Sequence, residues 1–251
     1  MTAHSFLRAG ALGVAALVLA LGAGPASAIV GGGPAPAEVA ARTVLIVSTR
    51  GASCTGTALA PDLVLTAAHC VKPAADYAVA ILGGGAPRLI PVTGIVVHPS
   101  FADDQFRTRR PTPDLAVIRL AENLPASTRP ARLSTSGLPA KGTVFLVAGY
   151  GMTADGAEKT AGTLRAVSLP SIGTTGGIMA RLSAPEGAAG ACTGDSGGPA
   201  FADGTVAGVV SWVTAAGGAR GCGGVTGITL VGLFSDWIRS AAAKLGRPLG
   251  E

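Results

Sequence analysis

A serine framed by glycines is the first feature of this sequence that could do chemistry. Residues 194–198 read GDSGG. Glycine adopts tight and left-handed backbone conformations at little cost, so this loop would free the Ser196 hydroxyl and let neighbouring N–H groups point at one spot. Such donors hold the oxyanion of an acyl-transfer intermediate, and losing one costs ~2.7–4 kcal/mol. The same residues also fit an ordinary glycine-rich turn, so catalysis can be inferred only if the sequence also offers a general base and an acid for Ser196.

Order along the chain selects the type of partner. The pentapeptide also fits the G-x-S-x-G turn of α/β-hydrolases, but there the histidine follows the serine, and here the last histidine is His98. In the subtilisin order an aspartate precedes the histidine. The only aspartate before His69 is Asp62, in what reads as the same hairpin. The order histidine, aspartate, serine remains.

His69 has better surroundings for catalysis than the other histidine of the mature chain. It follows a predicted strand at the start of a short helical turn, and Cys70 comes directly after it. A disulfide at Cys70 would fix the backbone beside the imidazole. His98 precedes Pro99 at the end of an apolar strand, where a lone histidine is usually structural. We therefore take His69 as the candidate general base.

Asp114 is the candidate carboxylate. It begins residues 114–120, DLAVIRL, which read as a buried strand. A buried carboxylate must be paired or hydrogen-bonded, and holding one tautomer of His69 would be such a pairing. An acid that caps a turn is the alternative interpretation. Asp103 and Asp104 look like loop residues and are weaker candidates.

The N-terminal residues predict a secretory signal. A weakly basic start with Arg8 precedes an apolar run over 9–24, and Ala-Ser-Ala occupies 26–28. These are the three parts of a signal peptide, and the run is shorter than the roughly 20 residues of a membrane-spanning helix. We therefore expect 1–28 to be removed and 29–251 to act outside the cell, with no membrane attachment.

Composition argues against several other functions. The formal net charge is +5 at pH 7, and a nucleic-acid reader would want more basic and aromatic residues on one face. Four cysteines in an exported chain indicate disulfides, but the number alone does not decide the pairing. There is no C-x-x-C motif, and only His69 and His98 remain after export, so we expect no metal and no cofactor.

The rest of the chain predicts an all-β fold. Short β-branched runs recur between glycine- and proline-rich turns, which is typical of sandwiches and barrels, and there is no regular alternation with helices. Residues 123–142 lack periodicity and read as a linker. Apolar residues at helical spacing over 234–245 predict a C-terminal helix. The predicted strands are 43–48, 63–66, 78–82, 90–98, 115–120, 143–148, 164–169, 206–212 and 228–231.

Six blocks together resemble the chymotrypsin- and trypsin-like serine peptidases, here of a secreted, bacterial type. They run in family order over essentially the whole mature chain. Tyr150 is a mild departure, since the family often has tryptophan there. The blocks are LTAAHC at 65–70, DLAV at 114–117, GDSGGP at 194–199, IVGG at 29–32, GYG at 149–151 and SW at 211–212.

The resemblance implies two packed antiparallel β-barrels of chymotrypsin type with a C-terminal α-helix. The site would lie in the cleft between the barrels. The resemblance also implies the disulfides Cys54–Cys70 and Cys192–Cys222, each beside a catalytic residue. The expected divisions are about 29–125 for the first barrel, 140–232 for the second and 233–245 for the helix.

The resemblance also assigns roles. Ser196 would be the nucleophile, His69 the general base and Asp114 the residue that orients the histidine. The backbone N–H groups of Gly194 and Ser196 would hold the oxyanion. Ser211 would support the carboxylate of Asp114.

Activation in this family requires a new N-terminus. The ammonium group of the first isoleucine pairs with the aspartate before the serine, here Ile29 and Asp195. A buried Asp195 without a partner would be costly, so the pair would hold the oxyanion loop in shape. Because Ile29 follows Ala28 directly, we expect signal removal itself to create the active N-terminus.

The predicted specificity pocket has no charge. Gly190 falls where trypsin-like enzymes carry the aspartate of the pocket floor. Val213 and Trp212 follow Ser211, and Val213 replaces a glycine that usually leaves the pocket wall open. Thr226 would lie on the opposite wall. These residues resemble an elastase-like pocket, so we expect cleavage after small aliphatic residues such as alanine or valine.

The expected partners are peptide or protein substrates and protein inhibitors, and we expect a monomer that binds no nucleic acid. The alternative function is a non-catalytic homologue that acts as a binding protein. Such homologues typically lose a triad member, whereas this chain keeps all three, with Ile29 and Asp195. A third function, ester hydrolysis, would use the same acyl chemistry. No acidic loop is convincing enough to predict a calcium site.

Overall fold

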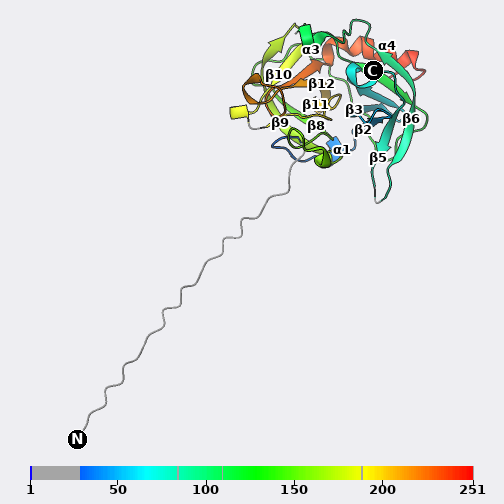
Figure 1. The fold of residues 1–251 in the computed structure, drawn as a ribbon. Coiled ribbons are helices and arrows are strands. Elements are labelled where there is room, and N and C mark those ends of the chain that lie inside the picture. The colour runs from blue at the N-terminus through cyan, green and yellow to red at the C-terminus, as the bar shows by residue number, and fades with distance from the viewer. Residues whose placement is uncertain (2–28, 84, 109, 188, 251) are drawn as a thin grey trace.

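Two antiparallel β-barrels lie side by side in the computed structural model, and a helix ends the chain (Figure 1). The structure describes Met1 and residues 29–83, 85–108, 110–187 and 189–250. Apart from Met1, the predicted signal peptide lies outside the described residues. Within the described part of the chain, no helix is both long enough and apolar enough to span a membrane.

The first barrel is a closed ring in the order β2-β3-β4-β7-β6-β5. Its core is made of aliphatic side chains such as Ile46, Val64 and Ile118. Gly56 in β3 leaves room for that core, because a Cβ there would lie 2.6 Å from Val64 Cγ1. The strands are β2 Thr43–Ser48, β3 Ser53–Ala60, β4 Leu63–Thr66, β5 Tyr77–Ile81, β6 Arg88–Val97 and β7 Ala116–Leu120.

The second barrel closes in the order β8-β9-β10-β13-β12-β11, and the short strand β1 pairs with β9 outside the ring. Phe145, Leu169 and Ile228 are among its fully buried side chains. The strands are β1 Gly33–Pro34, β8 Val144–Gly149, β9 Arg165–Thr175, β10 Met179–Leu182, β11 Pro199–Ala202, β12 Thr205–Val213 and β13 Thr226–Leu230.

The helices are short except the last. In α4, Ile238, Ala241 and Ala242 are buried, and the helix contacts β7 of the first barrel. The predicted C-terminal helix is therefore confirmed. The helices are α1 Ala37–Ala40, α2 Ala68–Val71, α3 Gln105–Thr108 and α4 Ser235–Lys244, with 3-10 turns η1 Glu158–Thr160, η2 Pro185–Gly187, η3 Ala216–Gly218 and η4 Gly232–Phe234.

One apolar cluster joins the two barrels. Leu65 and Val117 of the first barrel pack in the same cluster as Val206 and Val209 of the second and Ile238 of α4. Strands β2 and β3 contact β8, and β3 also contacts β11. Because the two barrels share this core, side chains at their seam are held at fixed distances across it.

The predicted all-β fold and each of the predicted strands are found, with ends that differ by a few residues. Besides the two-residue strand β1, three strands were not predicted, namely β3, β10 and β11. Their sequences SCTGTALA, MARL and PAFA hold few β-branched residues, and small side chains make a weak strand signal. These strands form because neighbouring strands pair with them on both sides.

A buried carboxylate with two partly exposed arginine partners ties the end of the chain to the first barrel. Asp62, between β3 and β4, lies 2.7 Å from Nε of both Arg119 and Arg247. Arg119 also donates to the carbonyl of Leu245 at 2.6 Å. Burial alone would raise the pKa of Asp62, but the hydrogen bond from Arg247 and the charges of both arginines lower it below its ordinary value. Asp62 thus has a structural use.

Candidate active site

A buried carboxylate holds His69. Asp114 precedes β7, and its side chain is 0% exposed. Its Oδ2 lies 2.7 Å from Nδ1 of His69, and its Oδ1 accepts the backbone N–H of His69 at 3.0 Å. Because an ionised carboxylate only accepts hydrogen bonds, the Nδ1 of a neutral His69 carries the proton, and its Nε2 is the nitrogen that can take one up.

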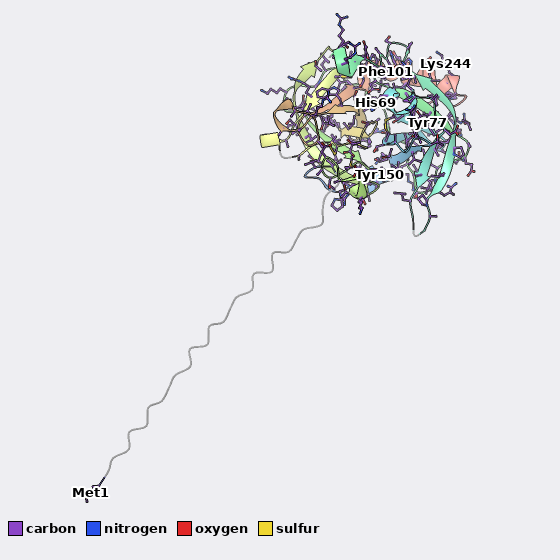
Figure 2. All side chains as sticks on the ribbon, viewed as in Figure 1. Met1, His69, Tyr77, Phe101, Tyr150 and Lys244 are labelled. Atoms are coloured by element: carbon purple, nitrogen blue, oxygen red, sulfur yellow. A yellow bond between two sulfur atoms is a disulfide. The ribbon has the colours of Figure 1, made fainter. Side chains whose placement is uncertain are left out.

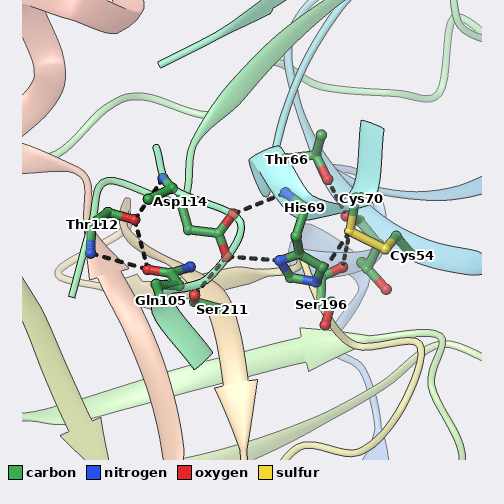
Figure 3. A network of polar contacts seen from close by, with 11 residues as sticks. Cys54, Thr66, His69, Cys70, Gln105, Thr112, Asp114, Ser196 and Ser211 are labelled. Carbon is green, nitrogen blue, oxygen red and sulfur yellow. Dashed lines mark hydrogen bonds and ion pairs between the residues drawn. A yellow bond between two sulfur atoms is a disulfide. The ribbon is translucent and has the colours of Figure 1, made fainter. Parts of the chain in front are cut away.

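A β-bulge in the second barrel brings Ser211 to the same carboxylate. The pairing of β12 with β13 loses its register between Val210 and Trp212, which leaves Ser211 as the extra residue. Bulges redirect side chains in this way. The Ser211 hydroxyl donates to Oδ2 of Asp114 at 2.6 Å (Figure 3). Three hydrogen bonds therefore stabilise a charge that would otherwise be costly to bury.

His69 itself lies at the seam of the two barrels (Figure 2). It belongs to α2, directly after β4, and its side chain is 26% exposed, so a substrate can reach it. The disulfide between Cys54 and Cys70 fixes the chain beside it. Sγ of Cys70 lies 3.8 Å from Nε2 of His69 and 3.6 Å from the carbonyl oxygen of Ser196. Ser196 accordingly lies next to the imidazole (Figure 3).

That disulfide also decides how one cluster of metal-ligating residue types is interpreted. Ligand atoms of Cys54, His69 and Cys70 all lie within 4.8 Å of one another. Both sulfur atoms are joined in the disulfide, and metal binding by cysteine needs a thiolate. The cluster therefore serves to place His69.

The glycines around Ser196 are required by both backbone shape and space. Gly194 has φ +98° and Gly197 has φ +81°, in a region that side chains with a Cβ rarely adopt. A Cβ on Gly197 would also overlap Oγ1 of Thr66 and the carbonyl oxygen of Thr55. The loop that carries Ser196 is thus pressed directly against the first barrel.

The N–H groups of the same loop alternate between engaged and available. Those of Asp195 and Gly197 donate to the carbonyl groups of Cys192 and Val210 at 3.0 and 2.7 Å. Within the described residues, no acceptor is found for the N–H groups of Gly194 and Ser196. These are the two groups expected to hold an oxyanion.

Asp195 is fully buried beside Ser196. Its two carboxyl oxygens accept the N–H groups of Gly151 and Cys192, each at 2.8 Å. Burial raises its pKa to about 7 in spite of these two hydrogen bonds. Among the described lysines and arginines, none forms an ion pair with Asp195. A cationic partner would therefore be needed to stabilise the charged form of Asp195 at neutral pH.

The segment that begins at Ile29 is docked on the second barrel. Ile29 is 0% exposed, and Val30 forms a β-bridge with Gly190, five residues before Asp195. Ile29 has φ +54°, which is unfavourable for a β-branched residue. That angle is defined only while a residue precedes Ile29, so chain cleavage at this point would remove the strain.

The predicted pocket residues lie together where β12 ends and β13 begins. A Cβ on Gly190 would lie 2.9 Å from the Gly224 carbonyl oxygen and 3.2 Å from Oγ1 of Thr226, so a side chain there would be crowded. Val213 pairs with Thr226 across the two strands. Thr226 is fully buried and its hydroxyl accepts a backbone N–H. Val213 and Trp212 are partly exposed.

Both predicted disulfides are present. Cys54–Cys70 lies beside His69, and Cys192–Cys222 lies next to the loop that carries Ser196. Asp103 and Asp104, the weaker acid candidates, are paired with Lys72 and Arg107 in exposed ion pairs.

His98 is used for packing against α4. Its Nδ1 accepts the N–H of Ser100 at 3.2 Å. Its ring centroid lies 5.2 Å from that of Phe234 and 4.7 Å from that of Trp237. Burial lowers its pKa below the ordinary value. These contacts support a structural role for this histidine.

Thr55 is a residue that the sequence reasoning missed. It is fully buried in β3 and forms hydrogen bonds to the loop that carries Ser196. The one signal in the sequence is its position directly after Cys54. Its partners in that loop lie more than a hundred residues away, so spacing alone could not reveal them.

Known proteins resemble most of this chain. Residues 29–238 match the protein family described as Trypsin. The chain is 32% identical to brachyurin of Leptuca pugilator over 206 residues, 74% of this chain and 86% of that protein. It is 30% identical to trypsin 5G1 of Aedes aegypti over 240 residues, 85% of each. The fold matches mouse neuropsin with TM-score 0.70 and 24% identity, over 84% of this chain and 99% of that one.

Proposed function

The chain belongs to the trypsin family of serine proteases, and from that premise we propose that it is a secreted endopeptidase in which Ser196 is the nucleophile. His69 is the general base, and Asp114 orients it. The observation that carries the proposal is the line of contacts from Ser211 through Asp114 to Nδ1 of His69, next to Ser196. These groups come from both barrels and meet where substrate can enter.

The proposed reaction is acyl transfer. Nε2 of His69 takes the hydroxyl proton of Ser196 as its oxygen attacks the peptide carbonyl. The Asp114 carboxylate stabilises the imidazolium that forms. His69 then gives the proton to the leaving amine, and water releases the acyl group by the reverse steps.

The oxyanion of each tetrahedral intermediate is assigned to the N–H groups of Gly194 and Ser196. Support comes from their lack of a described acceptor, while the neighbouring N–H groups are engaged. Donors that are fixed before the reaction stabilise the developing charge without reorganisation, and each is worth ~2.7–4 kcal/mol.

Activation is proposed to follow removal of residues 1–28. The ammonium group of Ile29 would then pair with Asp195, whose buried carboxyl calls for a cation. The burial of Ile29 and the bridge between Val30 and Gly190 support this, because they bring the segment to the same side of the second barrel. Removal of Ala28 would also relieve the left-handed backbone of Ile29.

The proposed specificity is for small aliphatic residues. The crowding around Gly190 leaves no room for an acidic pocket floor, which argues against cleavage after arginine or lysine. The Val213 side chain narrows the pocket wall. The relatives named above are animal proteins, and one of them is a trypsin. They support the family but give no support to a bacterial-type or elastase-like enzyme.

Steady-state hydrolysis of four peptide substrates with Ala, Val, Phe or Arg before the scissile bond tests this function. We expect the mature protein to favour Ala and Val, and Ser196→Ala to remove hydrolysis of all four. A clear preference for Arg would overturn the pocket assignment. Equal hydrolysis by Ser196→Ala would overturn the mechanism.

A further inference from the structure

Thr55 lies at the crossing point between the two halves of the candidate active site. It is near the start of β3, in the first barrel, and is 0% exposed. Its hydroxyl donates to the carbonyl of Gly194 at 2.8 Å and accepts the N–H of Tyr150 at 3.0 Å. Its backbone N–H donates to the carbonyl of Ser196 at 2.8 Å. Three hydrogen bonds therefore run from one residue into the second barrel.

The two carbonyl groups held by Thr55 flank the nucleophile. The carbonyl of Gly194 belongs to the peptide plane just before Asp195, and the carbonyl of Ser196 belongs to the plane just after Ser196. The N–H of Ser196, one of the two proposed oxyanion donors, lies on the plane between them. Because Gly194 has φ +98°, its backbone has the freedom of glycine, and an external contact is needed to hold it.

Thr55 is also joined to the segment that carries His69. Its carbonyl oxygen accepts the hydroxyl of Thr66 at 2.9 Å, three residues before His69. Its neighbour Cys54 forms the disulfide with Cys70, the residue after His69. The general base and the nucleophile are thus both tied to residues 54 and 55.

The side chain of Thr55 is held in one orientation. Its methyl group lies 3.1 Å from the place that a Cβ on Gly198 would occupy, so the methyl faces the glycine that follows the nucleophile loop. With the methyl packed there, the hydroxyl points at the Gly194 carbonyl and the Tyr150 N–H. A buried hydroxyl that both donates and accepts satisfies two groups that would otherwise be unpaired.

We propose that Thr55 is a positioning residue for catalysis: its hydroxyl holds the Gly194 peptide, and with it the oxyanion donors, in register with His69. This inference rests on the proposed function. It goes beyond that function, because the triad and the two oxyanion donors could be present in a chain whose loop had no such side-chain anchor.

Three variants of the mature protein test the role of the hydroxyl. Thr55→Val keeps the shape and removes the hydroxyl, whereas Thr55→Ser keeps the hydroxyl. Thr57→Val is the matched control, because Thr57 is also fully buried, lies two residues along the same strand, and has a hydroxyl with no described partner. Each variant is measured for kcat and KM on one peptide substrate and for thermal unfolding.

We expect Thr55→Val to lower kcat by about tenfold or more with little change in KM. The variant leaves the buried Gly194 carbonyl and Tyr150 N–H without their partner, and the loop that contacts the transition state shifts as a result. Thr55→Ser is expected to keep most of the kcat of the wild type, and Thr57→Val all of it. All kcat values are taken well below each unfolding temperature, so a loss of kcat reports positioning and not the fraction folded.

A folded Thr55→Val with kcat within twofold of the wild type would overturn the inference, as would an equal loss in Thr57→Val. If Thr55→Val does not fold, Thr55→Ala removes the same hydroxyl with a smaller side chain and is judged by the same criterion. Labelling of the wild type by a fluorophosphonate separates the two levels. If folded wild-type protein is not labelled, the proposed function is refuted. If the wild type is labelled but Thr55→Val keeps the kcat of the wild type, the positioning role alone is refuted.

Discussion

The hydroxyl of Ser211 donates a 2.6 Å hydrogen bond to the carboxylate of Asp114, and the two residues come from different barrels. The carboxyl oxygen that accepts it is also 2.7 Å from Nδ1 of His69. Docking of the second barrel therefore completes the surroundings of a carboxylate that the first barrel has already buried.

Asp114→Asn is expected to lower kcat by about 10⁴-fold, the usual loss when a triad keeps its shape but not its carboxylate. One oxygen of Asp114 serves both Ser211 and His69 Nδ1, and the other accepts the His69 backbone N–H. Both oxygens of Asp114 accept hydrogen bonds, but an asparagine has one oxygen and one NH₂ group. Its NH₂ group would therefore face a hydrogen-bond donor of His69 or Ser211. The pH profile of kcat on a peptide substrate measures the loss, and a decrease below tenfold would contradict the orienting role.

Asp195 is expected to make stability depend on pH in a form that retains residues before Ile29. Burial raises its folded pKa to about 7 from an ordinary value of 3.8. A carboxyl with a raised folded pKa favours folding at pH below 3.8, and this contribution is lost as the pH rises through about 7. We expect the mature form to escape this loss, because the proposed pairing with the ammonium of Ile29 would stabilise the charged Asp195.

Urea unfolding of the two forms across this pH range measures the difference in the free energy of unfolding. Asp195→Asn in the longer form is the control, since it removes the titrating group and should flatten the curve. Parallel curves for the longer and mature forms would refute the pairing of Ile29 with Asp195.

Val213→Gly is expected to open the pocket wall and raise kcat/KM for a Phe substrate over an Ala substrate by about tenfold or more, in line with the 10–200-fold that small changes of pocket volume produce. Val144→Gly, at an exposed valine of β8, is the control for loss of a valine outside the pocket. An unchanged Phe-to-Ala ratio in Val213→Gly would show that this side chain does not set specificity.

Asp62→Asn is expected to lower the free energy of unfolding at neutral pH by roughly 2 kcal/mol, because hydrogen bonds to a buried charge are lost. Its arginine partners lower its folded pKa. This stability is therefore present above the unfolded pKa and is lost as the pH falls through the folded pKa. Denaturant unfolding at neutral and acidic pH checks both statements.

Glu122→Gln is the matched control for Asp62→Asn, since it breaks an exposed pair with Arg88. Exposed pairs contribute little, so its effect should be smaller. If the two variants lower the free energy of unfolding equally, the contacts of Asp62 with Arg119 and Arg247 do not stabilise the fold more than an exposed pair does.

The sequence could predict the strands that are rich in β-branched residues and the segments around His69, Asp114 and Ser196. Local chemistry was informative there because glycines, a neighbouring cysteine and chain order left few alternatives. Asp114 was the most ambiguous of the three, since its sequence also fits a turn cap. Its burial and its contact with Ser211 come only from the docking of the barrels.

Contacts between distant segments could not be predicted in the same way. The Thr55 hydroxyl meets Gly194 across 139 positions, and Asp62 meets Arg247 across 185. The residues around a threonine in a strand or an aspartate in a turn do not predict which distant residue it contacts. The bulge at Ser211 is similar, because the glycine at the shift of register, Gly227, lies on the opposite strand and does not mark Ser211 as the extra residue.

The most direct measurement is labelling of the mature protein, residues 29–251, with a fluorophosphonate probe, followed by peptide mapping of the modified residue. A serine activated by His69 reacts with such a probe, whereas an ordinary serine does not. We expect one label on Ser196, and none in Ser196→Ala or in a form that retains residues before Ile29. A folded mature protein that is not labelled at Ser196 would contradict its assignment as the nucleophile and favour a non-catalytic binding protein.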